Sequence, residues 1–228
     1  MNKMKFGGLQ KTSLIDFPDR ISTVLFAIGC NLRCPFCYNW RLVLEPKGPF
    51  LSEEMVFEIL ESRKKNIDAV VVTGGEPGTQ SDLPQFLKRL KEKGFAIKLD
   101  TNGFFPKMLE ECLSYLDYIA VDVKTSPERY SLLGVEDVSG FLRTVAKVKG
   151  GKVDYEFRST MVPSFIDNQS VQEIGEIVKG AKRYAFQQFV PGDTLDKSFN
   201  TVKPYTVSVI DGFVRIMKNY VDEVILRV

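Results

Sequence analysis

The amino-acid sequence predicts an α/β fold in which parallel strands form an open, partial barrel covered by helices. Six apolar runs rich in β-branched residues alternate with amphipathic stretches along the chain. The runs are nearly continuous in apolar residues, which is typical of parallel strands buried on both faces. Six strand–helix units are too few for a closed eight-stranded barrel. A flat doubly wound sheet is the alternative fold.

The expected elements follow one another in a regular order. We predict strands at 21–28, 67–73, 95–100, 118–123, 153–162 and 184–190. We predict helices at about 52–65, 82–93, 106–116, 137–149, 169–180 and 205–221. Ser52 and the Ser81-Asp82 pair are residue types that begin helices. Gly94 and the Gly150-Gly151 pair stand where the preceding helices should end.

The size and composition of the chain describe one globular domain, which we place at 1–228. A formal net charge of +2 argues against nucleic acid as the main partner, because such binding usually needs a strong basic excess. The sequence shows neither a signal-peptide pattern nor an apolar run long enough to span a membrane. We therefore expect a cytoplasmic protein with no membrane partner.

Three cysteines stand close together at the end of the first apolar run. Cys30, Cys34 and Cys37 form a CxxxCxxC pattern, and the chain contains no histidine. Three thiolates suit an iron–sulfur cluster, which normally takes four cysteine ligands. With only three, one iron keeps a position for an outside ligand, and an open position of this kind indicates chemistry more than structure.

Other interpretations of the cysteines are open at this point. A zinc site needs four ligands, and the fourth could only be Cys112, the one remaining cysteine. A disulfide within the loop would leave odd thiols, and nothing in the sequence suggests secretion. Cys112 lies in a helical pattern, so we expect it to be a small buried apolar residue.

Polar residues follow the expected strands at their carboxyl ends, where parallel α/β folds gather their chemistry. Each is weak evidence alone, because strands commonly end in polar turn residues. Their convergence on the end that carries the cysteines favours a single site. The residues are Thr73-Gly74-Gly75-Glu76-Pro77, Asp100-Thr101-Asn102-Gly103, Asp122-Val123-Lys124, Arg158 and Gln187-Gln188.

The glycine pair Gly74-Gly75 has two interpretations. It could form an ordinary strand-to-helix turn, or it could let a ligand approach bare backbone. In the second case Glu76 could accept a hydrogen bond from a ligand ammonium group.

The charged residues after the later strands also have more than one possible role. Asp100 and Asn102 could cap the next helix or turn, or bind sugar hydroxyls. Asp122 and Lys124 could form a surface pair that contributes little stability. Inside the mouth of a barrel the same two charges would be costly without a ligand or a partner.

Taken together, these motifs resemble the radical S-adenosylmethionine (SAM) superfamily. The CxxxCxxC pattern is its signature, with Phe36 directly before the last cysteine, and Gly74-Gly75-Glu76-Pro77 is similar to its methionine-binding motif. The glycyl-radical-enzyme activases are closest in appearance, particularly the activating proteins of anaerobic ribonucleoside-triphosphate reductase. The opening segment 7–18, followed by Gly29-Cys30-Asn31, is typical of one branch of them.

The resemblance implies a partial (β/α)6 TIM-like barrel with one [4Fe–4S] cluster on the three cysteines and SAM on the fourth iron. Phe36 would lie near the adenine, and Gly74, Gly75 and Glu76 near the methionine amine. Asp100 and Asn102 would lie near the ribose or a bound monovalent cation, with Asp122 and Lys124 nearby. Arg158 would meet the carboxylate end of SAM.

The activity implied by the resemblance is reductive cleavage of SAM to methionine and a 5′-deoxyadenosyl radical. This radical would abstract hydrogen from a glycine in a partner enzyme, expected to be anaerobic ribonucleotide reductase. An external electron donor such as flavodoxin or ferredoxin would reduce the cluster. The stretch 12–17 could help to hold the partner's glycine loop.

Competing functions and two departures from the family pattern stay open. The protein could instead activate another glycyl radical enzyme of the pyruvate formate-lyase type, or act on a small molecule. A non-catalytic electron carrier or zinc module is the alternative from another class. Some activases carry a histidine where this chain has Gln187-Gln188, and relatives commonly have Thr-Leu where it has Gly78-Thr79.

Overall fold

The computed structural model describes residues 3–44 and 46–227, and the chain divides into two compact units. The first unit contains the residues up to 31 together with 39–101 and 105–119. The second contains 32–38, 102–104 and the residues from 120 onward.

The strands are assigned to one eight-stranded sheet, in which their order is the same as along the chain. They are β1 (Phe6–Ser13), β2 (Ser22–Ala27), β3 (Ala69–Gly74), β4 (Ala96–Thr101), β5 (Tyr118–Asp122), β6 (Asp154–Met161), β7 (Ala181–Gln188) and β8 (Val221–Arg227). β1 pairs antiparallel with β2. The pairs β2–β3, β3–β4 and β6–β7 are parallel, as predicted, and β7–β8 is parallel as well.

Helices follow most of the strands. They are α1 (Trp40–Leu44), α2 (Glu53–Arg63), α3 (Leu83–Glu92), α4 (Pro106–Cys112), α5 (Ser139–Lys149), α6 (Asn168–Val178) and α7 (Val207–Met217). Short 3₁₀ turns lie at Pro77–Thr79, Leu113–Tyr115, Pro127–Leu133 and Lys197–Thr201. In the described part of the chain, none of the helices combines the length and the apolar character that a membrane span needs.

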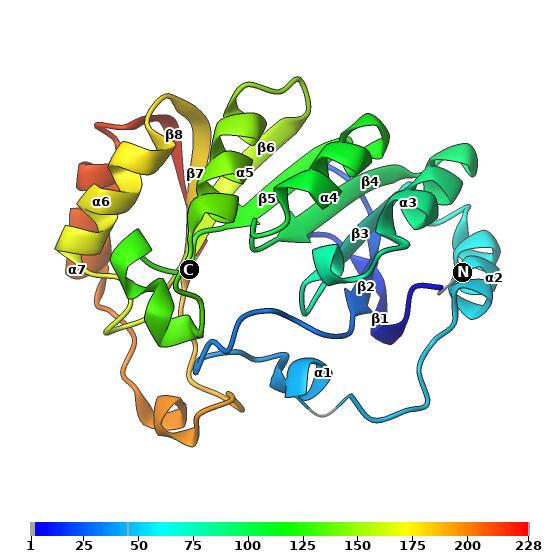
Figure 1. Ribbon diagram of the computed structural model, residues 1–228, viewed down its shortest axis with the longest axis horizontal. Coiled ribbons are helices and arrows are strands. Elements are labelled where there is room, and N and C mark those ends of the chain that lie inside the picture. Colours follow the sequence, from blue (N-terminus) through cyan, green and yellow to red (C-terminus); the bar gives the residue numbers. More distant parts are fainter. Residues whose placement is uncertain (1–2, 45, 228) are drawn as a thin grey trace. The chain divides into compact units, whose positions relative to one another are not determined.

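In the first unit, apolar strand residues build the core. Val24 of β2 and Val71 of β3 are directly paired in the parallel register and are fully or almost fully buried. Phe17 and Tyr118 complete this apolar cluster. Helices α3 and α4 lie side by side against the strands (Figure 1). Ser52 begins α2 as predicted, because its side chain accepts a hydrogen bond from the amide of Met55.

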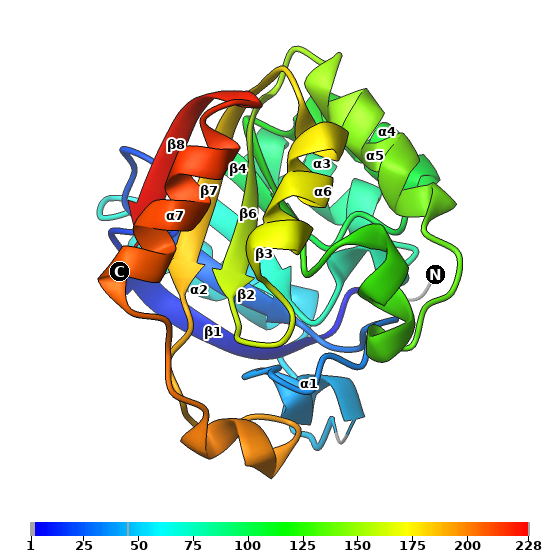
Figure 2. The same ribbon diagram turned by 90° about the vertical axis from the view of Figure 1, so that its left-hand side faces the viewer.

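In the second unit, aromatic residues connect the strands to the helices. The ring of Phe186 on β7 lies 6.2 Å from that of Phe213 on α7 and 5.0 Å from that of Tyr184. Helices α6 and α7 lie side by side over β6–β8 (Figure 2). Asp167 and Ser170 form a capping box at the start of α6, with reciprocal bonds of 2.8 and 2.7 Å.

All six predicted strands and all six predicted helices are present, with ends shifted by a few residues. The prediction of the last strand at 184–190 was late, since β7 begins at Ala181. Gly94 ends α3 in the left-handed region at a φ of 84°, as expected.

Three elements were missed, β1, α1 and β8. β1 contains two glycines and polar residues, and β8 carries three charged residues, so neither has an apolar run as long as those of the central strands.

The two ends of β2 carry different parts of the chain. Ala27 pairs with Gly74 at the carboxyl end, where β2 leads toward Cys30. Ser13 pairs with Ser22 at the other end. The stretch 12–17 therefore lies at the end of β2 opposite Cys30, and its role in holding a partner's loop stays a prediction.

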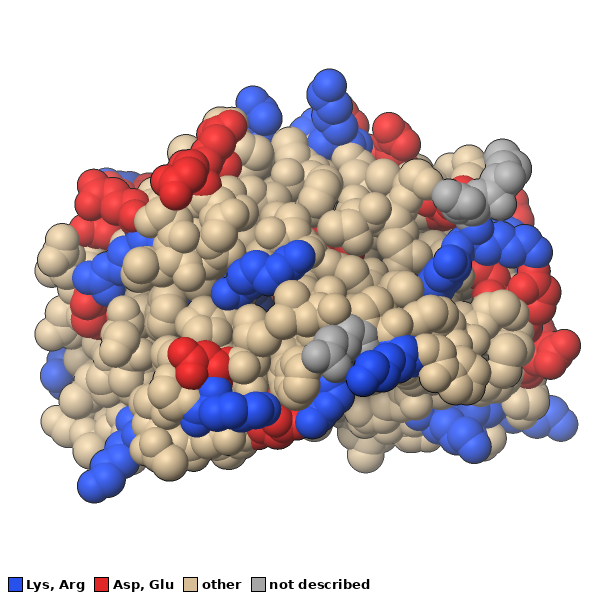
Figure 3. Space-filling model, turned by 60° about the horizontal axis from the view of Figure 1, so that its bottom comes forward, with Lys and Arg blue, Asp and Glu red and all other residues tan. Residues whose placement is uncertain are grey.

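Both signs of charge occur on the surface. On the face drawn in Figure 3, Lys and Arg are interspersed with Asp and Glu and separated by uncharged surface. This face has no continuous basic stripe among its described residues, which agrees with a formal net charge of only +2.

Candidate functional site

The residues predicted to form the site are divided between the two units, and each group is described separately. The first unit holds Cys30, Gly74, Gly75, Glu76 and Asp100. The second unit holds Cys34, Phe36, Cys37, Asn102, Asp122, Lys124 and Arg158.

In the first unit, the glycine motif is bonded to the segment that precedes Cys30. The amide of Gly75 donates to the carbonyl of Ala27 at 2.8 Å, and the amide of Glu76 donates to the carbonyl of Gly29 at 2.7 Å. The side chain of Asn39 donates to the carbonyl of Gly74 at 3.1 Å. These bonds fix the backbone of the motif beside the cysteine segment.

The close approach of these two segments explains the paired glycines. A Cβ atom at Gly75 would lie 2.0 Å from the carbonyl oxygen of Gly29, and one at Gly74 would lie 2.4 Å from the backbone nitrogen of Ala27. Gly74 also has a φ of 115°, which side-chain residues rarely adopt. Both positions therefore require glycine for this contact within the chain, and the approach of a ligand to the pair stays a prediction.

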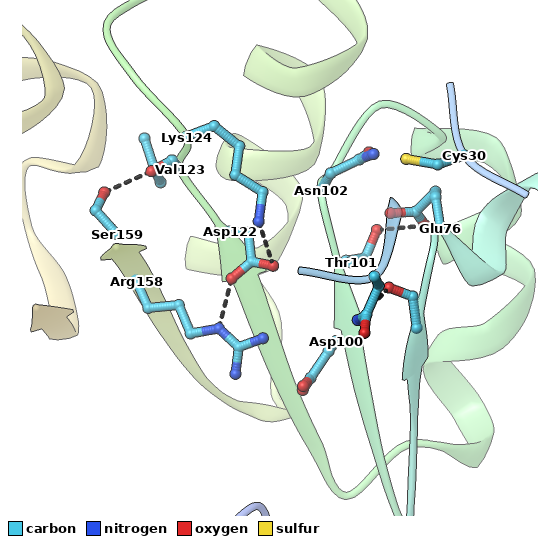
Figure 4. Close-up of polar contacts among 12 residues, drawn as sticks. Cys30, Glu76, Asp100, Thr101, Asn102, Asp122, Val123, Lys124, Arg158 and Ser159 are labelled. Carbon is cyan, nitrogen blue, oxygen red and sulfur yellow. Dashed lines mark hydrogen bonds and ion pairs between the residues drawn. The ribbon is translucent and has the colours of Figure 1, made fainter. Parts of the chain in front are cut away.

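The side chain of Glu76, which follows the two glycines, is held by hydrogen bonds. Its side chain is almost fully buried, and Oε1 accepts from the amide of Gly78 and from Oγ1 of Thr101, both at 2.9 Å (Figure 4). A buried carboxylate that accepts two hydrogen bonds has a fixed orientation. Thr101 was predicted only as one of the polar residues after its strand, and this hydrogen bond gives it a specific role in holding Glu76.

Asp100 forms an ion pair that the sequence analysis missed. Nζ of Lys98 lies 2.6 Å from Oδ1 of Asp100, and both residues are buried. The two stand at i and i+2 on β4, so their side chains share one face of the sheet. The spacing was visible in the sequence, but Lys98 was hidden within an otherwise apolar run.

In the second unit, distant segments hold the cysteine loop. The amide of Cys37 donates to the carbonyl of Cys34 at 3.1 Å. The carbonyl of Cys37 accepts from the amide of Leu195, and that of Pro35 accepts from the amide of Asp196, at 3.1 and 2.8 Å. Leu195 and Asp196 are separated from the cysteine loop by about 160 residues, so no local sequence pattern could identify them.

Phe36 belongs to an aromatic cluster of the second unit. Its ring is almost fully buried and lies 4.9 Å from that of Phe165 and 6.3 Å from that of Phe199. The cluster fixes the ring of Phe36, which lies between Cys34 and Cys37 in the sequence, with geometry typical of stabilising aromatic pairs.

Asn102 forms a turn, which was one of its two predicted roles. Its Oδ1 accepts from the amide of Phe104 at 3.2 Å, and the following Gly103 has a φ of 82°. Asn102 is nevertheless buried, and its proposed contact with a ribose stays a prediction.

The charged residues of the second unit form a cluster of three. Nε of Arg158 lies 2.5 Å from Oδ1 of Asp122, and Nζ of Lys124 lies 3.0 Å from Oδ2 (Figure 4). Their side chains are only 13–24% exposed, so this is no solvated surface pair. Burial alone would raise the pKa of Asp122, but the two cations outweigh it and hold that pKa below its ordinary value.

The cysteine loop also affects the pKa of Lys124. Burial alone would lower the pKa of Lys124, but the charges of Asp122 and Cys34 raise it above its ordinary value. The ammonium group therefore stays protonated near Cys34. The backbone amide of Lys124 donates to the hydroxyl of Tyr130 at 3.1 Å, which fixes the start of this segment.

The register of β7 separates the two glutamines at its end. Gln187 pairs with Thr160 and Ala185 pairs with Arg158, so Gln187 shares the face of Arg158. Gln188 points to the opposite face, which also carries Phe186, and its amide donates to the carbonyl of Tyr205 at 3.4 Å. Only Gln187 is therefore placed on the side of the charged cluster.

The chemistry of the cysteines suits an iron–sulfur cluster, because thiolates are its ligands. All four cysteines are thiols and not half-cystines in the part of the chain that the structure describes. Cys112 is fully buried, and burial raises its pKa to about 12, with a further contribution from Glu111. A thiol of this kind does not supply a metal-binding thiolate at neutral pH. Its predicted role as a buried apolar residue is confirmed, and three thiols remain for a cluster.

Comparisons with known proteins agree with this donor set. The family model described as the Radical SAM superfamily matches residues 24–181. A protein of Methanocaldococcus jannaschii that bears the name of a glycyl-radical enzyme activating enzyme is 34% identical over 99% of this chain and 96% of its own. The pyruvate formate-lyase-activating enzyme of Clostridium pasteurianum is 28% identical over 82% of this chain and 81% of its own.

Solved structures show a similar fold. SuiB of Streptococcus suis, in a crystal structure bound to S-adenosylmethionine, has a TM-score of 0.68 and 17% identity over 88% of this chain. This chain spans about half of SuiB, 48% of its length. QueE of Escherichia coli has a TM-score of 0.58 and 15% identity over 99% of this chain and 94% of its own. The fold class predicted from the sequence is confirmed by these likenesses.

Proposed function

The chain belongs to the radical SAM superfamily, and from that membership we propose that it activates a glycyl-radical enzyme by generating the glycyl radical in it. The observation that carries the proposal is the 34% identity, over nearly the whole of both chains, to a protein named as an activating enzyme. As a member of the superfamily the protein uses a [4Fe–4S] cluster and SAM.

The thiolates of Cys30, Cys34 and Cys37 would hold the cluster, with SAM on the iron that lacks a cysteine. With both groups bound, the reduced cluster and SAM would supply the reactive group, because one-electron cleavage of the sulfonium would give methionine and a 5′-deoxyadenosyl radical able to take a hydrogen atom from glycine. The support for this ligand set is the CxxxCxxC pattern together with the inertness of the buried Cys112.

Residues of the chain itself would bind and orient SAM. The Gly74-Gly75 backbone and the carboxylate of Glu76 would face the methionine amine, and Phe36 would lie near the adenine. Two cations surround one carboxylate in the Asp122 cluster, so its formal charge is +1. A net positive cluster suits the carboxylate end of SAM, which is the role proposed for Arg158.

We propose anaerobic ribonucleoside-triphosphate reductase as the partner. The support is the similarity of the opening segment 7–18 to the activases of that reductase. A pyruvate formate-lyase type of enzyme is the second candidate, favoured by the 28% identity to the enzyme from Clostridium pasteurianum. Flavodoxin or ferredoxin would supply the electron.

The experiment uses the full chain with its cluster reconstituted anaerobically and reduced with dithionite. Incubation with SAM should release 5′-deoxyadenosine, and Cys34→Ala should abolish the release. Addition of the reductase should produce a glycyl doublet in the electron paramagnetic resonance spectrum. A variant of the reductase with alanine in place of the radical glycine is the control and should give no doublet.

The possible outcomes separate the parts of the proposal. Release of 5′-deoxyadenosine with a doublet only on a pyruvate formate-lyase would replace the first partner with the second. Release without a doublet on either enzyme would contradict the protein substrate, and turnover of a purified metabolite would then favour a small-molecule enzyme.

A further inference from the structure

A buried ion pair lies on β4 of the first unit. Lys98 is 2% exposed and Asp100 is 6% exposed, and Nζ of the lysine lies 2.6 Å from Oδ1 of the aspartate. Lysine is among the residues that are almost never fully buried unless they are paired. A lysine at this position therefore needs an explanation beyond packing.

Lys98 has apolar neighbours along its aliphatic stem and a polar neighbour at its ammonium group. Lys98 is directly paired with Val71 of β3, which belongs to the buried apolar cluster with Val24. Its aliphatic stem continues this apolar layer, while the ammonium group reaches toward the carboxyl end of β4, where Asp100 stands. The sheet thus presents one fixed positive charge to one carboxylate.

This arrangement does not fit the monovalent cation that the family resemblance places near Asp100. A metal ion bonded to the same carboxylate oxygen would lie within a few ångströms of the Lys98 ammonium, and like charges at this distance repel strongly in a buried site. Buried charges are either paired or coordinate metals. Here the pairing is already made by the chain itself.

We propose that Lys98 is a built-in counter-ion that takes the place of an exchangeable monovalent cation at Asp100. In this role Lys98 is a positioning residue. It keeps the Asp100 carboxylate oriented for SAM, and no dissolved Na⁺ or K⁺ is required for SAM to bind.

The first test uses the reconstituted wild-type chain without reductant, so that SAM binds and is not cleaved. The dissociation constant of SAM is measured by calorimetry in choline chloride, NaCl and KCl at equal ionic strength. We expect the three values to agree within about twofold. Binding that is tenfold or more tighter in Na⁺ or K⁺ than in choline would overturn the proposal, whatever any variant does.

The second test removes the ammonium group. Lys98→Met keeps the length of the stem and removes the ammonium group that lies beside the Asp100 carboxylate, so SAM should bind at least tenfold more weakly in choline chloride. K⁺ or NH₄⁺ should restore much of the affinity, because either can then occupy the place of the ammonium. A Lys98→Met variant that binds SAM as well as wild type in choline would overturn the proposal.

Two further variants serve as controls. Lys93→Met removes an exposed lysine that pairs with Glu61 and should bind SAM like wild type in every salt. Lys98→Met combined with Asp100→Asn removes both charges, so its SAM affinity should not depend on the cation. If Lys98→Met alone fails to fold, the double variant should fold, because both charges of the buried pair are removed together. Failure of the double variant to fold would assign Lys98 to packing and overturn the proposal.

Discussion

At the scale of single residues, burial and neighbouring charge decide which similar groups can react. The chain has four cysteines of identical chemistry, but Cys112 is fully buried and its pKa is raised to about 12. Cys34 is also buried, but it lies in a loop near the protonated Lys124. A nearby cation favours a thiolate, and thiolates are the form that binds metal.

Cys112→Ala should therefore keep the cluster. We expect unchanged iron content and an unchanged absorption spectrum after reconstitution, with a loss of about 1 kcal/mol in unfolding free energy from poorer packing. Cys34→Ala is the matched control and should not assemble the cluster. Loss of the cluster in Cys112→Ala would instead favour a fully ligated electron carrier.

The Asp122 cluster predicts a pH dependence of stability. The folded-state pKa of Asp122 lies below its ordinary value, so the unfolded chain takes up the proton first as pH falls. The stabilisation is complete above about pH 4 and is lost as pH falls from there through the folded pKa. Urea unfolding of Asp122→Asn should show a deficit on the order of 2 kcal/mol at pH 6 that narrows below about pH 4.

Asp154→Asn is the control for this measurement. Asp154 pairs with Lys182 at 3.8 Å, and both side chains are 59% exposed, so its loss should change stability little at any pH. A deficit in Asp122→Asn that stays constant down to pH 3 would contradict the assignment of the slope to Asp122.

At the scale of elements, the loop after β3 is defined by how closely it approaches the end of β2. Two backbone hydrogen bonds connect the loop to Ala27 and Gly29, and the space between the two backbones leaves no room for a Cβ atom at Gly75. The loop and the segment that leads into Cys30 are therefore fixed together, and any change in one displaces the other.

Gly75→Ala should disrupt this contact. The new methyl group would lie 2.0 Å from the Gly29 carbonyl oxygen, so the backbone must shift. Because a displacement of about 1 Å in an active site can reduce the rate about 100-fold, we expect a comparable loss in 5′-deoxyadenosine formation. Gly192→Ala is the control, since its nearest neighbour is 4.0 Å away, and it should retain the wild-type rate. An active Gly75→Ala variant would show that the loop tolerates the shift.

At the scale of the whole molecule, parallel strands give the fold two functionally different ends. The carboxyl ends of β2 and β3 lead to Cys30 and the glycine motif, whereas the turn between β1 and β2 lies at the other end. Two large apolar residues, Leu14 and Ile15, are 71% and 88% exposed in that turn. Hydrogen bonds from the amides of Ile15 and Asp16 to Ser13 fix its shape.

Leu14→Ser combined with Ile15→Ser should leave SAM cleavage unchanged. Neither side chain is near the end that carries Cys30, so the rate of 5′-deoxyadenosine formation without a partner should stay within twofold of wild type. The rate is measured with dithionite as reductant. A fall of tenfold or more, in a variant that still carries its cluster, would contradict this separation of the two ends.

Features that depend on neighbouring residues in the sequence could be predicted, and features that depend on distant residues could not. The six central strands, Ser52 as a helix cap and Cys112 as a buried residue follow from patterns within a few positions, and all were confirmed. β1 and β8 were missed because each pairs on one side with a central strand and needs no apolar run of its own. The role of Lys98 was missed because the sequence does not show which residue a charged side chain inside an apolar run will pair with.

Periodicity and residue type act over short distances, so they were enough to predict the α/β class, the three thiols and the glycine motif. The residues that support these features could be identified only in the folded protein. Leu195 and Asp196 hold the cysteine loop, Thr101 fixes Glu76, and Lys98 neutralises Asp100. The physical reason is that hydrogen bonds and ion pairs depend on distances in space, and the folding of the chain, not the order of its residues, sets those distances.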